Sequence, residues 1–467
     1  MTQKTVQDVL DQVDASMDTI LSRLCDLIRI PSISTDPAHA ADCARAAQWL
    51  VDDLAAMGFE ASSRETPGHP VVVAHDTAAT TGPHVLFYGH YDVQPPDPLD
   101  LWDSPPFEPR IVQGANGRRQ IVARGASDDK GQLMTFLEAC RAWKQVTGSL
   151  PIAVTILLEG EEEVGSRNLP EFLTRNAPEL SHDIALVCDT DLWDDETPAV
   201  TTSVRGLVSE EIEITCADRD LHSGMYGNVV RNPFHVLTRA LADLHDEDGR
   251  ITLEGFYDGV APLPPEVRQE WDRLPFDAGH FLGQFGLSIS AGEQGYSLLE
   301  QIWARPSFEV HGIKGGYSEP GFKTVLPSRA SAKVSFRLVG EQDPETIRAA
   351  FRAYIRARVP TDCTVTFINH GVGYPASLPI DGELLQRART ALSAEWGRPA
   401  AISGTGGSIP VISSFRTLLG MDSLMIGFAR FDNRIHSPNE KYDLDSLYHG
   451  IRSWVRILGA YASQTDA

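Results

Sequence analysis

Residues 152–166 read IAVTILLEGEEEVGS, an apolar run that passes directly into four glutamates. A short run of this kind, rich in β-branched residues, predicts a buried β-strand over Ile152–Leu158. Carboxylates crowded at the end of a strand repel one another unless a cation lies among them. We favour a bound metal ion, with one carboxylate left over to move a proton. The alternative is a solvated acidic helix start, because carboxylates favour the positive end of a helix.

Similar runs recur along the chain and alternate with helical patterns. Strands are predicted at Val71–Ala74, Val85–Tyr88, Ile184–Val187 and Ser423–Gly427. Helices are predicted between Val6 and Ile28, over Ala40–Met57, Gln132–Lys144 and Gly382–Trp396, and from Leu444 onward. A glycine-rich loop is expected at Ser403–Gly407. Alternating strands and helices predict an α/β fold, with a mostly parallel sheet covered by helices on both faces.

The pattern changes between residues 206 and 378. Val208–Cys216 and Arg329–Leu338 alternate apolar and polar residues, as half-exposed antiparallel strands do, and a helix is expected near Pro233–His245. Because 467 residues exceed the size at which one hydrophobic core stops growing, two domains are expected. We predict a catalytic, metal-binding domain over residues 1–205 and 379–467, with an α+β domain inserted at residues 206–378.

Composition excludes several classes of function. The net charge of −24 argues against nucleic-acid binding, because phosphates would be repelled. No run approaches the roughly 18–20 apolar residues that a membrane span needs, and residues 1–30 lack the apolar stretch of a signal peptide. The six cysteines contain no Cys-x-x-Cys pair and are predicted to be buried, reduced thiols of a cytoplasmic protein rather than a disulfide framework.

Further candidate metal ligands follow other predicted strands. His90 and Asp92 come after Val85–Tyr88, and Asp189 comes after Ile184–Val187. Open α/β sheets bind ligands at the carboxyl ends of their strands, so the motifs lie where the predicted fold would place a site. Asp92 is expected to orient His90, since metal-bound histidines commonly need an acceptor for their second ring nitrogen.

Asp128 and His436 complete the candidate set. Taken singly, Asp128 could belong to a turn that caps a helix, and His436 could be an ordinary loop residue. Taken together, two histidines and several carboxylates suit divalent cations such as Zn²⁺ or Mn²⁺. Nucleophilic catalysis is not expected, because Ser223 lacks a Gly-x-Ser-x-Gly elbow and no cysteine has a convincing activating partner. The pattern favours a two-metal hydrolase.

With these residues located, the chain resembles the dinuclear-metal exopeptidase family that includes carnosine dipeptidase, cytosolic non-specific dipeptidase, aminoacylase and acetylornithine deacetylase. The resemblance runs essentially from end to end and is strongest toward the dipeptidase branch. The motifs that carry it are, in order, Gly89–Val93 (GHYDV), Arg124–Gly131 (RGASDDKG), Leu158–Ser166 (LEGEEEVGS), Asp220–Gly224 (DLHSG), Val310–Ile313 (VHGI), Lys323–Pro327 (KTVLP), Gly406–Pro410 (GGSIP) and His436–Glu440 (HSPNE).

The resemblance implies two divalent metal ions, with Zn²⁺ expected and Mn²⁺ or Co²⁺ as alternatives. By this resemblance, one ion would be held by His90 and Asp189. The other would be held by Glu163 and His436, and Asp128 would bridge both ions. Glu162 would act as general base and then general acid. Asp92 would orient His90.

The resemblance also implies a zinc-exopeptidase-like fold whose inserted domain serves as a lid and forms a homodimer. His222 would reach the active site of the partner subunit and stabilise the oxyanion. The implied substrate-binding positions are Arg337, Thr324, Ser408 and Gly407.

Thr405 departs from the pattern, because an acidic residue is expected there, close to where a free substrate amine would bind. From the resemblance as a whole we expect a two-metal peptidase that cleaves a dipeptide or short peptide with a free carboxylate end. An N-acyl amino-acid deacylase is the alternative that Thr405 leaves open. A catalytically inactive binding protein of the same fold is less favoured, since Glu162, Asp128 and both histidines are present.

Overall fold

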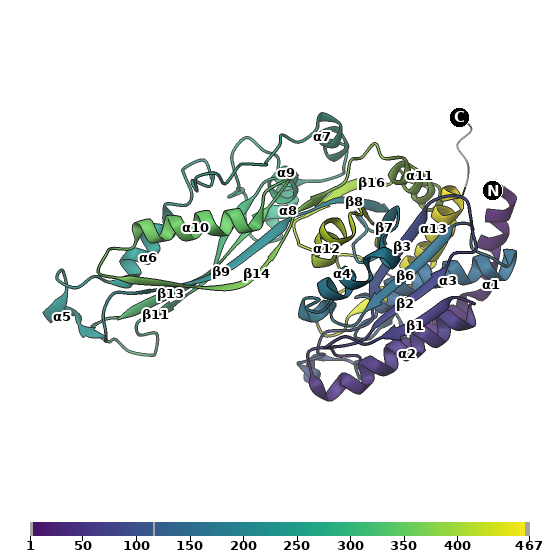
Figure 1. Cartoon of the computed structure of the whole chain (residues 1–467), viewed down its shortest axis with the longest axis horizontal. Coiled ribbons are helices and arrows are strands. Elements are labelled where there is room, and N and C mark those ends of the chain that lie inside the picture. Colours follow the sequence, from purple (N-terminus) through teal and green to yellow (C-terminus); the bar gives the residue numbers. More distant parts are fainter. Residues whose placement is uncertain (1–2, 115–116, 463–467) are drawn as a thin grey trace. The chain divides into compact units, whose positions relative to one another are not determined.

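The computed structural model describes residues 3–114 and 117–462, and the chain divides into two compact units (Figure 1). Unit 1 comprises Met1–Thr202, Leu378–Ser403 and Pro410–Ala467. Unit 2 comprises Ser203–Ser377 together with Gly404–Ile409, a segment outside the predicted insertion. The role of the insertion as a lid and dimerisation domain stays a prediction.

Unit 1 is built on a sheet whose central strands are parallel. β3 pairs with β6 and β7, and β7 pairs with β17, all in parallel, whereas β1, β2 and β8 join antiparallel at the edges. The strands are, in spatial order, β1 (Glu60–Arg64), β2 (Val71–Asp76), β6 (Ala153–Glu159), β3 (His84–His90), β7 (Ile184–Val187), β17 (Ser423–Met425) and β8 (Ala199–Val204). The predicted α/β class is confirmed.

Helices cover both faces of this sheet. Phe87 of β3 stacks on Phe136 at 3.9 Å between ring centroids, while its neighbour Tyr88 meets Phe415 edge-on at 5.7 Å. Successive strand residues point to opposite faces, so these two contacts identify the two helical layers. One layer contains α1 (Gln3–Ile28), α3 (Lys130–Thr147), α11 (Glu383–Trp396) and α13 (Leu444–Tyr461). The other contains α4 (Leu169–Leu180), α12 (Pro410–Ser414) and η4 (Phe415–Leu419), as Figure 1 shows.

The long helix α1 forms where the apolar spacing predicts it. Val9, Val13, Ile20 and Leu24 lie on one face, and all four are buried in the core of unit 1. The helix ends at Ile28, shortly before Pro31, which cannot continue it. The second predicted helix is α2 (Ala40–Ala56), which packs on β1 and β2.

The loop predicted at Ser403–Gly407 is wrong in its first part, because β16 (Ala401–Thr405) is a strand that pairs with β8. Glycines at positions 404 and 406 indicate a turn, but tertiary contacts override that preference. The hydroxyl of Thr202 donates to the carbonyl oxygen of Ser403 at 3.2 Å, and Ser403 is buried. β8 continues into unit 2, where β15 (Ala376–Ser377) pairs with it.

A small antiparallel sheet in unit 1 pairs a strand near the C-terminus with two strands from residues 110–122. It consists of β18 (Lys441–Asp443), β5 (Arg119–Val122) and β4 (Arg110–Gln113). Lys441 pairs with Val122, and the amide of Ala123 donates to the carbonyl oxygen of Glu440 at 3.0 Å. Short 3₁₀ turns lie at η1 (Pro37–His39), η2 (Leu99–Leu101) and η3 (Glu162–Val164).

Unit 2 has its own core, formed by a four-stranded antiparallel sheet with helices on one face. The order is β11 (Ser307–Gly315), β13 (Arg329–Leu338), β9 (Gly206–Thr215) and β14 (Thr364–Gly373). Buried residues alternate with half-buried ones along the whole of β9, which confirms the predicted half-exposed strand. The buried face packs on α6 (Pro233–Ala242) and α10 (Pro344–Arg358).

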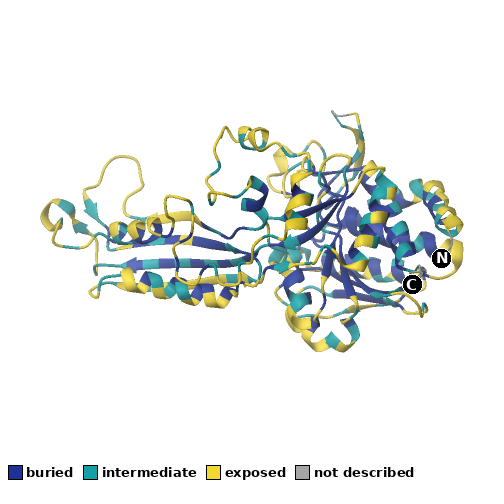
Figure 2. Ribbon diagram, turned by 90° about the horizontal axis from the view of Figure 1, so that it is seen from above, coloured by how far each residue is buried: buried dark blue, intermediate teal, exposed yellow. Residues whose placement is uncertain are grey.

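The remaining elements of unit 2 are short. They are α5 (Ser223–Tyr226), α7 (Pro265–Asp272), α8 (Ala278–Gly283), α9 (Leu298–Trp303) and the two-stranded ladder of β10 (Leu221–His222) and β12 (Val325–Leu326). Figure 2 shows that burial concentrates in the sheets and that the connecting segments are largely exposed.

All six cysteines are free, but the prediction that they are buried is wrong for half of them. Cys43, Cys140 and Cys188 are buried, whereas Cys25, Cys216 and Cys363 are half-buried. Cys216 and Cys363 lie just beyond the end of β9 and just before the start of β14, outside the regular ladder of the sheet. None of the described helices is both long enough and apolar enough to cross a membrane. The cytoplasmic location stays a prediction.

Candidate metal centre

The parallel strands of unit 1 deliver the candidate ligands to one edge of the sheet. β3 ends at His90 and β6 ends at Glu159, and these two residues pair in register. Asp189 follows the end of the neighbouring parallel strand β7. The carboxyl ends of adjacent parallel strands share an edge, so residues from distant parts of the sequence meet there.

Two groups of side chains are arranged so that each could hold a metal ion. The first is His90, Asp128 and Asp189, and the second is Asp128, Glu163 and His436. Within each group the ligating atoms all lie within 4.8 Å of one another. Asp128 belongs to both groups, and a carboxylate can offer one oxygen to each of two cations. The geometry therefore fits a pair of ions that share Asp128.

Asp128 lies between the two histidines. Its Oδ1 is 3.0 Å from Nε2 of His90, and its Oδ2 is 2.9 Å from Nε2 of His436. Burial acts to raise the pKa of Asp128, but the hydrogen bonds from His436 and His90 outweigh it and hold the pKa well below its usual range. The same carboxylate raises the pKa of His436 to about 10. The site thus concentrates negative charge that positive partners neutralise.

The donor set fits divalent cations. Oε1 of Glu163 is buried without a hydrogen-bond partner among the described residues, an arrangement that costs free energy unless something binds it. Burial raises the pKa of Asp189 well above its ordinary value, and the charges of Asp128 and Glu162 raise it further. A cation among these groups would remove both penalties. Imidazole nitrogens with carboxylate oxygens suit Zn²⁺ or Mn²⁺.

Asp92 connects His90 to the glutamates. Its Oδ1 lies 3.4 Å from Nδ1 of His90, and its two oxygens accept hydrogen bonds from the amides of Glu162 and Glu163 at 3.2 and 3.1 Å. The carbonyl oxygen of Asp92 is a second neighbour of Nδ1, at 3.1 Å. Nδ1 of His90 therefore has two oxygens of Asp92 within reach, and the Asp92 carboxylate also holds the backbone that carries the two glutamates. That the carboxylate orients His90 stays a prediction.

The four glutamates that stand out in the sequence have two different functions in the structure. Glu159 is buried and accepts hydrogen bonds from the hydroxyls of Tyr88 and Ser166, the latter at 2.9 Å. Glu161 accepts two hydrogen bonds from the side-chain Nδ2 of Asn168, at 3.0 and 2.8 Å. Neither Glu159 nor Glu161 belongs to a candidate metal-ligating group, whereas Glu163 does, so Glu162 and Glu163 are the candidates for chemistry.

Glu162 has the properties of a proton carrier. It is the first residue of η3, next to the proposed ligand Glu163, and it is not a member of either metal-ligating group. Burial raises its pKa to about 7, with the charges of Glu163 and Asp128 adding to the shift and His90 opposing it. A carboxyl group whose pKa lies near the working pH exchanges protons efficiently in both directions.

Glu440 is the residue of the centre that sequence reasoning missed. Its carboxylate accepts hydrogen bonds from Nη1 of Arg124 at 2.7 Å and from the amides of Gly125, Ser127 and Asp128 at 2.9, 2.8 and 3.0 Å. It therefore holds the loop that carries Asp128. A signal was present, because Glu440 closes the HSPNE motif, four residues after His436.

The loop that presents His436 has an unusual backbone. Arg434, His436 and Asn439 have φ values of 56°, 61° and 61°, a left-handed backbone conformation that residues other than glycine seldom adopt. Such conformations persist where the surrounding structure holds them, often at functional sites. The His436 side chain is 52% exposed, so this edge of the centre is open to solvent.

The other predicted site residues belong to unit 2. His222 is exposed at the start of α5, and its Nδ1 accepts a hydrogen bond from the amide of Gly224 at 3.0 Å. Thr324 is exposed, and its carbonyl oxygen accepts from the amide of Ser223 at 3.1 Å. Thr405 accepts a hydrogen bond from the amide of Gly407 at 3.2 Å.

Arg337 and Ser408 are in direct contact in unit 2. Nη1 of Arg337 donates to Oγ of Ser408 at 2.8 Å, and that hydroxyl donates to the carbonyl oxygen of Arg205 at 2.5 Å. Burial lowers the pKa of Arg205 to about 10, and the charge of Arg337 contributes. Two guanidinium groups therefore lie near one another, an arrangement suited to an anionic ligand.

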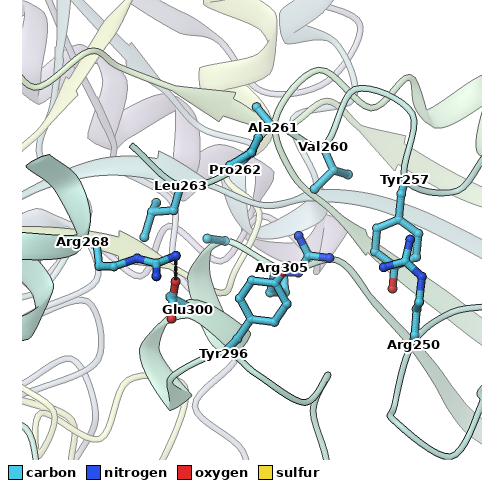
Figure 3. A pocket seen from close by; sticks show the side chains of 11 residues that line it. Arg250, Tyr257, Val260, Ala261, Pro262, Leu263, Arg268, Tyr296, Glu300 and Arg305 are labelled. Carbon is cyan, nitrogen blue, oxygen red and sulfur yellow. Dashed lines mark ion pairs between the residues drawn. The ribbon is translucent and has the colours of Figure 1, made fainter. Parts of the chain in front are cut away.

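Unit 2 also contains a cavity of about 270 Å³ that does not include any predicted site residue (Figure 3). Nε of Arg305 donates to Glu293 at 2.8 Å, and its guanidinium lies 4.2 Å from the ring centroid of Tyr296. Arg268 pairs with Glu300 at 2.7 Å. These charges are already matched by carboxylates, so the arrangement resembles a structural stack more than a ligand site.

Comparison with known proteins identifies the relatives of this chain. The model of the peptidase family M20/M25/M40 matches residues 86–460, which include both candidate metal-ligating groups. Cys-Gly metallodipeptidase DUG1 of Candida albicans is 30% identical over 98% of this chain and 96% of its own length. Beta-Ala-His dipeptidase of Rattus norvegicus is 28% identical over 94% of this chain and 92% of its own length.

Solved structures agree with this result. The M20 family metallo-carboxypeptidase Sso-CP2 from Sulfolobus solfataricus has a TM-score of 0.81 at 29% identity, over 95% of this chain and 99% of that one. The similarity extends over nearly the full length of both chains, so it includes the α/β sheet of unit 1 and the antiparallel sheet of unit 2.

Proposed function

The chain belongs to the peptidase family M20/M25/M40, and we propose that it is a two-metal dipeptidase acting on dipeptides or short peptides with a free carboxylate end. The observation that carries this proposal is Asp128, whose carboxylate is shared by two metal-ligating groups. Two-metal sites are a recurrent solution for hydrolysing amide bonds in aminopeptidases. The Cys-Gly and Beta-Ala-His dipeptidases among its relatives support a dipeptide substrate.

The proposed ions are Zn²⁺, with Mn²⁺ or Co²⁺ as alternatives. His90 and Asp189 would hold one ion, Glu163 and His436 the other, and Asp128 both. When bound, two such cations supply a Lewis acid for the substrate carbonyl and lower the pKa of a water molecule.

Glu162 would move the proton. Its carboxylate takes a proton from the attacking water and returns it to the leaving amine, a role supported by its pKa of about 7. Asp92 holds the backbone amide of Glu162 and so positions it. His222 would stabilise the negative charge that develops on the carbonyl oxygen, and one such donor is worth about 3 kcal/mol.

Arg337 would bind the free carboxylate of the substrate. Its guanidinium offers a planar pair of donors, and Ser408 holds it in place at 2.8 Å. The neighbouring Arg205 adds positive charge, which supports an anionic ligand. Thr324 and Gly407 are the further substrate-binding positions in this proposal.

Unit 2 would also form a homodimer. The exposure of His222 supports a role outside its own unit, in the active site of the partner subunit. In that arrangement each active site needs residues from two chains.

An N-acyl amino-acid deacylase is the second candidate, favoured by one observation. Thr405 is neutral and bonded to the amide of Gly407, so it offers no charge to a substrate amine. A substrate without a free amine, such as an acetylated amino acid, would lose nothing at this position.

A substrate panel tests both candidates. The enzyme is stripped with a chelator, reloaded with Zn²⁺, Mn²⁺ or Co²⁺, and assayed on dipeptides, C-amidated dipeptides and N-acetyl amino acids. We expect metal-dependent hydrolysis of dipeptides and at least a tenfold loss on C-amidation. Hydrolysis of N-acetyl amino acids alone would select the deacylase, and turnover that survives chelation would contradict the two-metal proposal.

A further inference from the structure

Two of the half-buried cysteines, Cys216 and Cys363, lie side by side in unit 2. Their Sγ atoms are 2.9 Å apart, although 147 residues separate them along the chain. The sheet register explains the proximity, because Thr215 of β9 pairs with Thr364 of β14 in an antiparallel ladder. The next positions outward are the two cysteines. Directly opposed antiparallel residues have Cα atoms about 4.5–5.5 Å apart, within the range that a disulfide spans.

The backbone on both sides of the pair is fixed. The amide of Cys216 donates to the carbonyl oxygen of Ser328 at 2.8 Å, and the amide of Cys363 donates to that of Pro360 at 2.9 Å. The strand register and these backbone hydrogen bonds therefore hold the two thiols next to each other. Because both residues are half-buried, a small oxidant can reach them.

The pair differs from the other cysteines. Cys43, Cys140 and Cys188 are buried, and within residues 3–114 and 117–462 no cysteine thiol other than those of Cys216 and Cys363 is hydrogen-bonded to another cysteine. Neither candidate metal cluster of the described residues includes Cys216 or Cys363. A dithiol with no third ligand favours disulfide chemistry over metal binding.

We propose that Cys216 and Cys363 are a redox-active dithiol that oxidises reversibly to an intramolecular disulfide. With hydrogen peroxide as the oxidant, one thiol attacks a peroxide oxygen, the O–O bond breaks, and a sulfenic acid and one water form. The second thiol then attacks the sulfenic sulfur, the S–S bond forms and a second water leaves. Both thiol protons end in water, and peroxide takes up the two electrons. A dithiol reductant reverses the step by thiol–disulfide exchange.

The bond would join β9 to β14 at the end of the sheet and close a loop of 147 residues. A cross-link of this kind stabilises by restricting the unfolded chain, so we expect oxidation to raise the melting temperature of the protein by about 5 °C. This inference does not depend on the peptidase proposal.

The test uses the full chain, treated with hydrogen peroxide or with dithiothreitol and then blocked with iodoacetamide. Peptide mapping without reduction should give, after peroxide, one linked pair that contains Cys216 and Cys363 and is lighter than the two free peptides by two hydrogen atoms. Dithiothreitol should restore both alkylated peptides. Cys216→Ser and Cys363→Ser should each abolish the link, whereas the matched control Cys25→Ser should keep it.

Three results would overturn the proposal. The wild type could show Cys216 and Cys363 both alkylated after peroxide, the link could join two chains on a non-reducing gel, or Cys25 could oxidise at a lower peroxide concentration than the pair. If Cys216→Ser fails to fold, the peptide map of the wild type and the Cys363→Ser variant still test the proposal. The melting temperature of Cys363→Ser should not change after peroxide treatment.

Discussion

The carboxylate of Glu440 lies 2.7 Å from the guanidinium of Arg124, in an ion pair whose side chains are only 0% and 1% exposed. The same carboxylate accepts hydrogen bonds from the backbone amides of Ser127 and Asp128. These two residues precede Glu440 in the sequence by 313 and 312 positions. The position of Asp128, the proposed shared metal ligand, is therefore set by a residue near the other end of the chain.

Replacing Glu440 with Gln should destabilise the protein and loosen the metal centre. The substitution leaves the Arg124 charge buried without its partner, which costs about 3 kcal/mol. Urea denaturation of the metal-free protein measures the loss, and metal titration measures the weaker binding. The control is Glu171→Gln, which breaks an exposed pair with Arg175 and should change stability by less than about 0.5 kcal/mol. Equal effects of the two substitutions would contradict the anchoring role.

Replacing Glu162 with Gln should remove turnover and leave the metal in place. Glu162 belongs to neither metal-ligating group, so metal content should stay at the wild-type value. Loss of general acid–base catalysis typically costs about 10²–10⁴-fold in rate. Glu161→Gln is the matched control, because Glu161 is bonded to Asn168 and should be dispensable for turnover. Retained activity in Glu162→Gln would refute the assignment.

Asp128 and Asp189 should differ in how many ions their loss releases. Asp128→Asn removes a ligand of both groups, so both ions should be lost, whereas Asp189→Asn should release only one. Elemental analysis after gel filtration gives the stoichiometry. The rise in melting temperature on adding Zn²⁺ should vanish in Asp128→Asn and shrink in Asp189→Asn. A single ion in the wild type would contradict the shared-carboxylate centre.

His182 should make the stability of unit 1 fall at acidic pH. Its ring stacks on that of His84 at 3.5 Å, and burial lowers its pKa to about 4, with the charges of His84 and His75 contributing. The unfolded chain binds this proton near pH 6.5, so the folded state is favoured in full above that pH and loses the benefit as pH falls toward 4.

We expect this group to account for a loss on the order of 2 kcal/mol between about pH 7 and pH 4. His182→Phe keeps a ring and removes the titration, so its free energy of unfolding should fall less with pH than that of the wild type. The comparison is made on metal-free protein, so that loss of metal does not contribute. Parallel pH profiles would show that His182 does not titrate in this way.

If His222 acts in the partner subunit, two inactive variants should complement each other. His222→Asn and Glu162→Gln, expressed together, should form mixed dimers in which one of the two sites is complete. Random pairing should restore about a quarter of the wild-type activity, since half of the dimers are mixed and each has one complete site. Co-expression that stays inactive, although mixed dimers form, would place His222 in the active site of its own subunit, and an active His222→Asn variant would place it outside catalysis.

The predicted elements of unit 1 follow from local patterns. The apolar residues that recur at helical spacing between Val6 and Ile28 predict α1, and the apolar run Ile152–Leu158 predicts β6. The loop predicted at Ser403–Gly407 is wrong because Ser403 bonds to Thr202, a contact that no local pattern contains. Propensity decides an element only where long-range pairing does not oppose it.

The sequence by itself determined the alternation of strands and helices and the residue types of a two-metal site, because periodicity and side-chain chemistry are local properties. Tertiary structure decided which acids are available for that site. Tyr88 and Asn168 bind Glu159 and Glu161, and Glu162 and Glu163 are left for chemistry. Tertiary structure also placed the Glu440 carboxylate against the backbone amide of Asp128, and Cys216 beside Cys363. Such pairings depend on how distant strands meet, and spacing along the chain does not encode them.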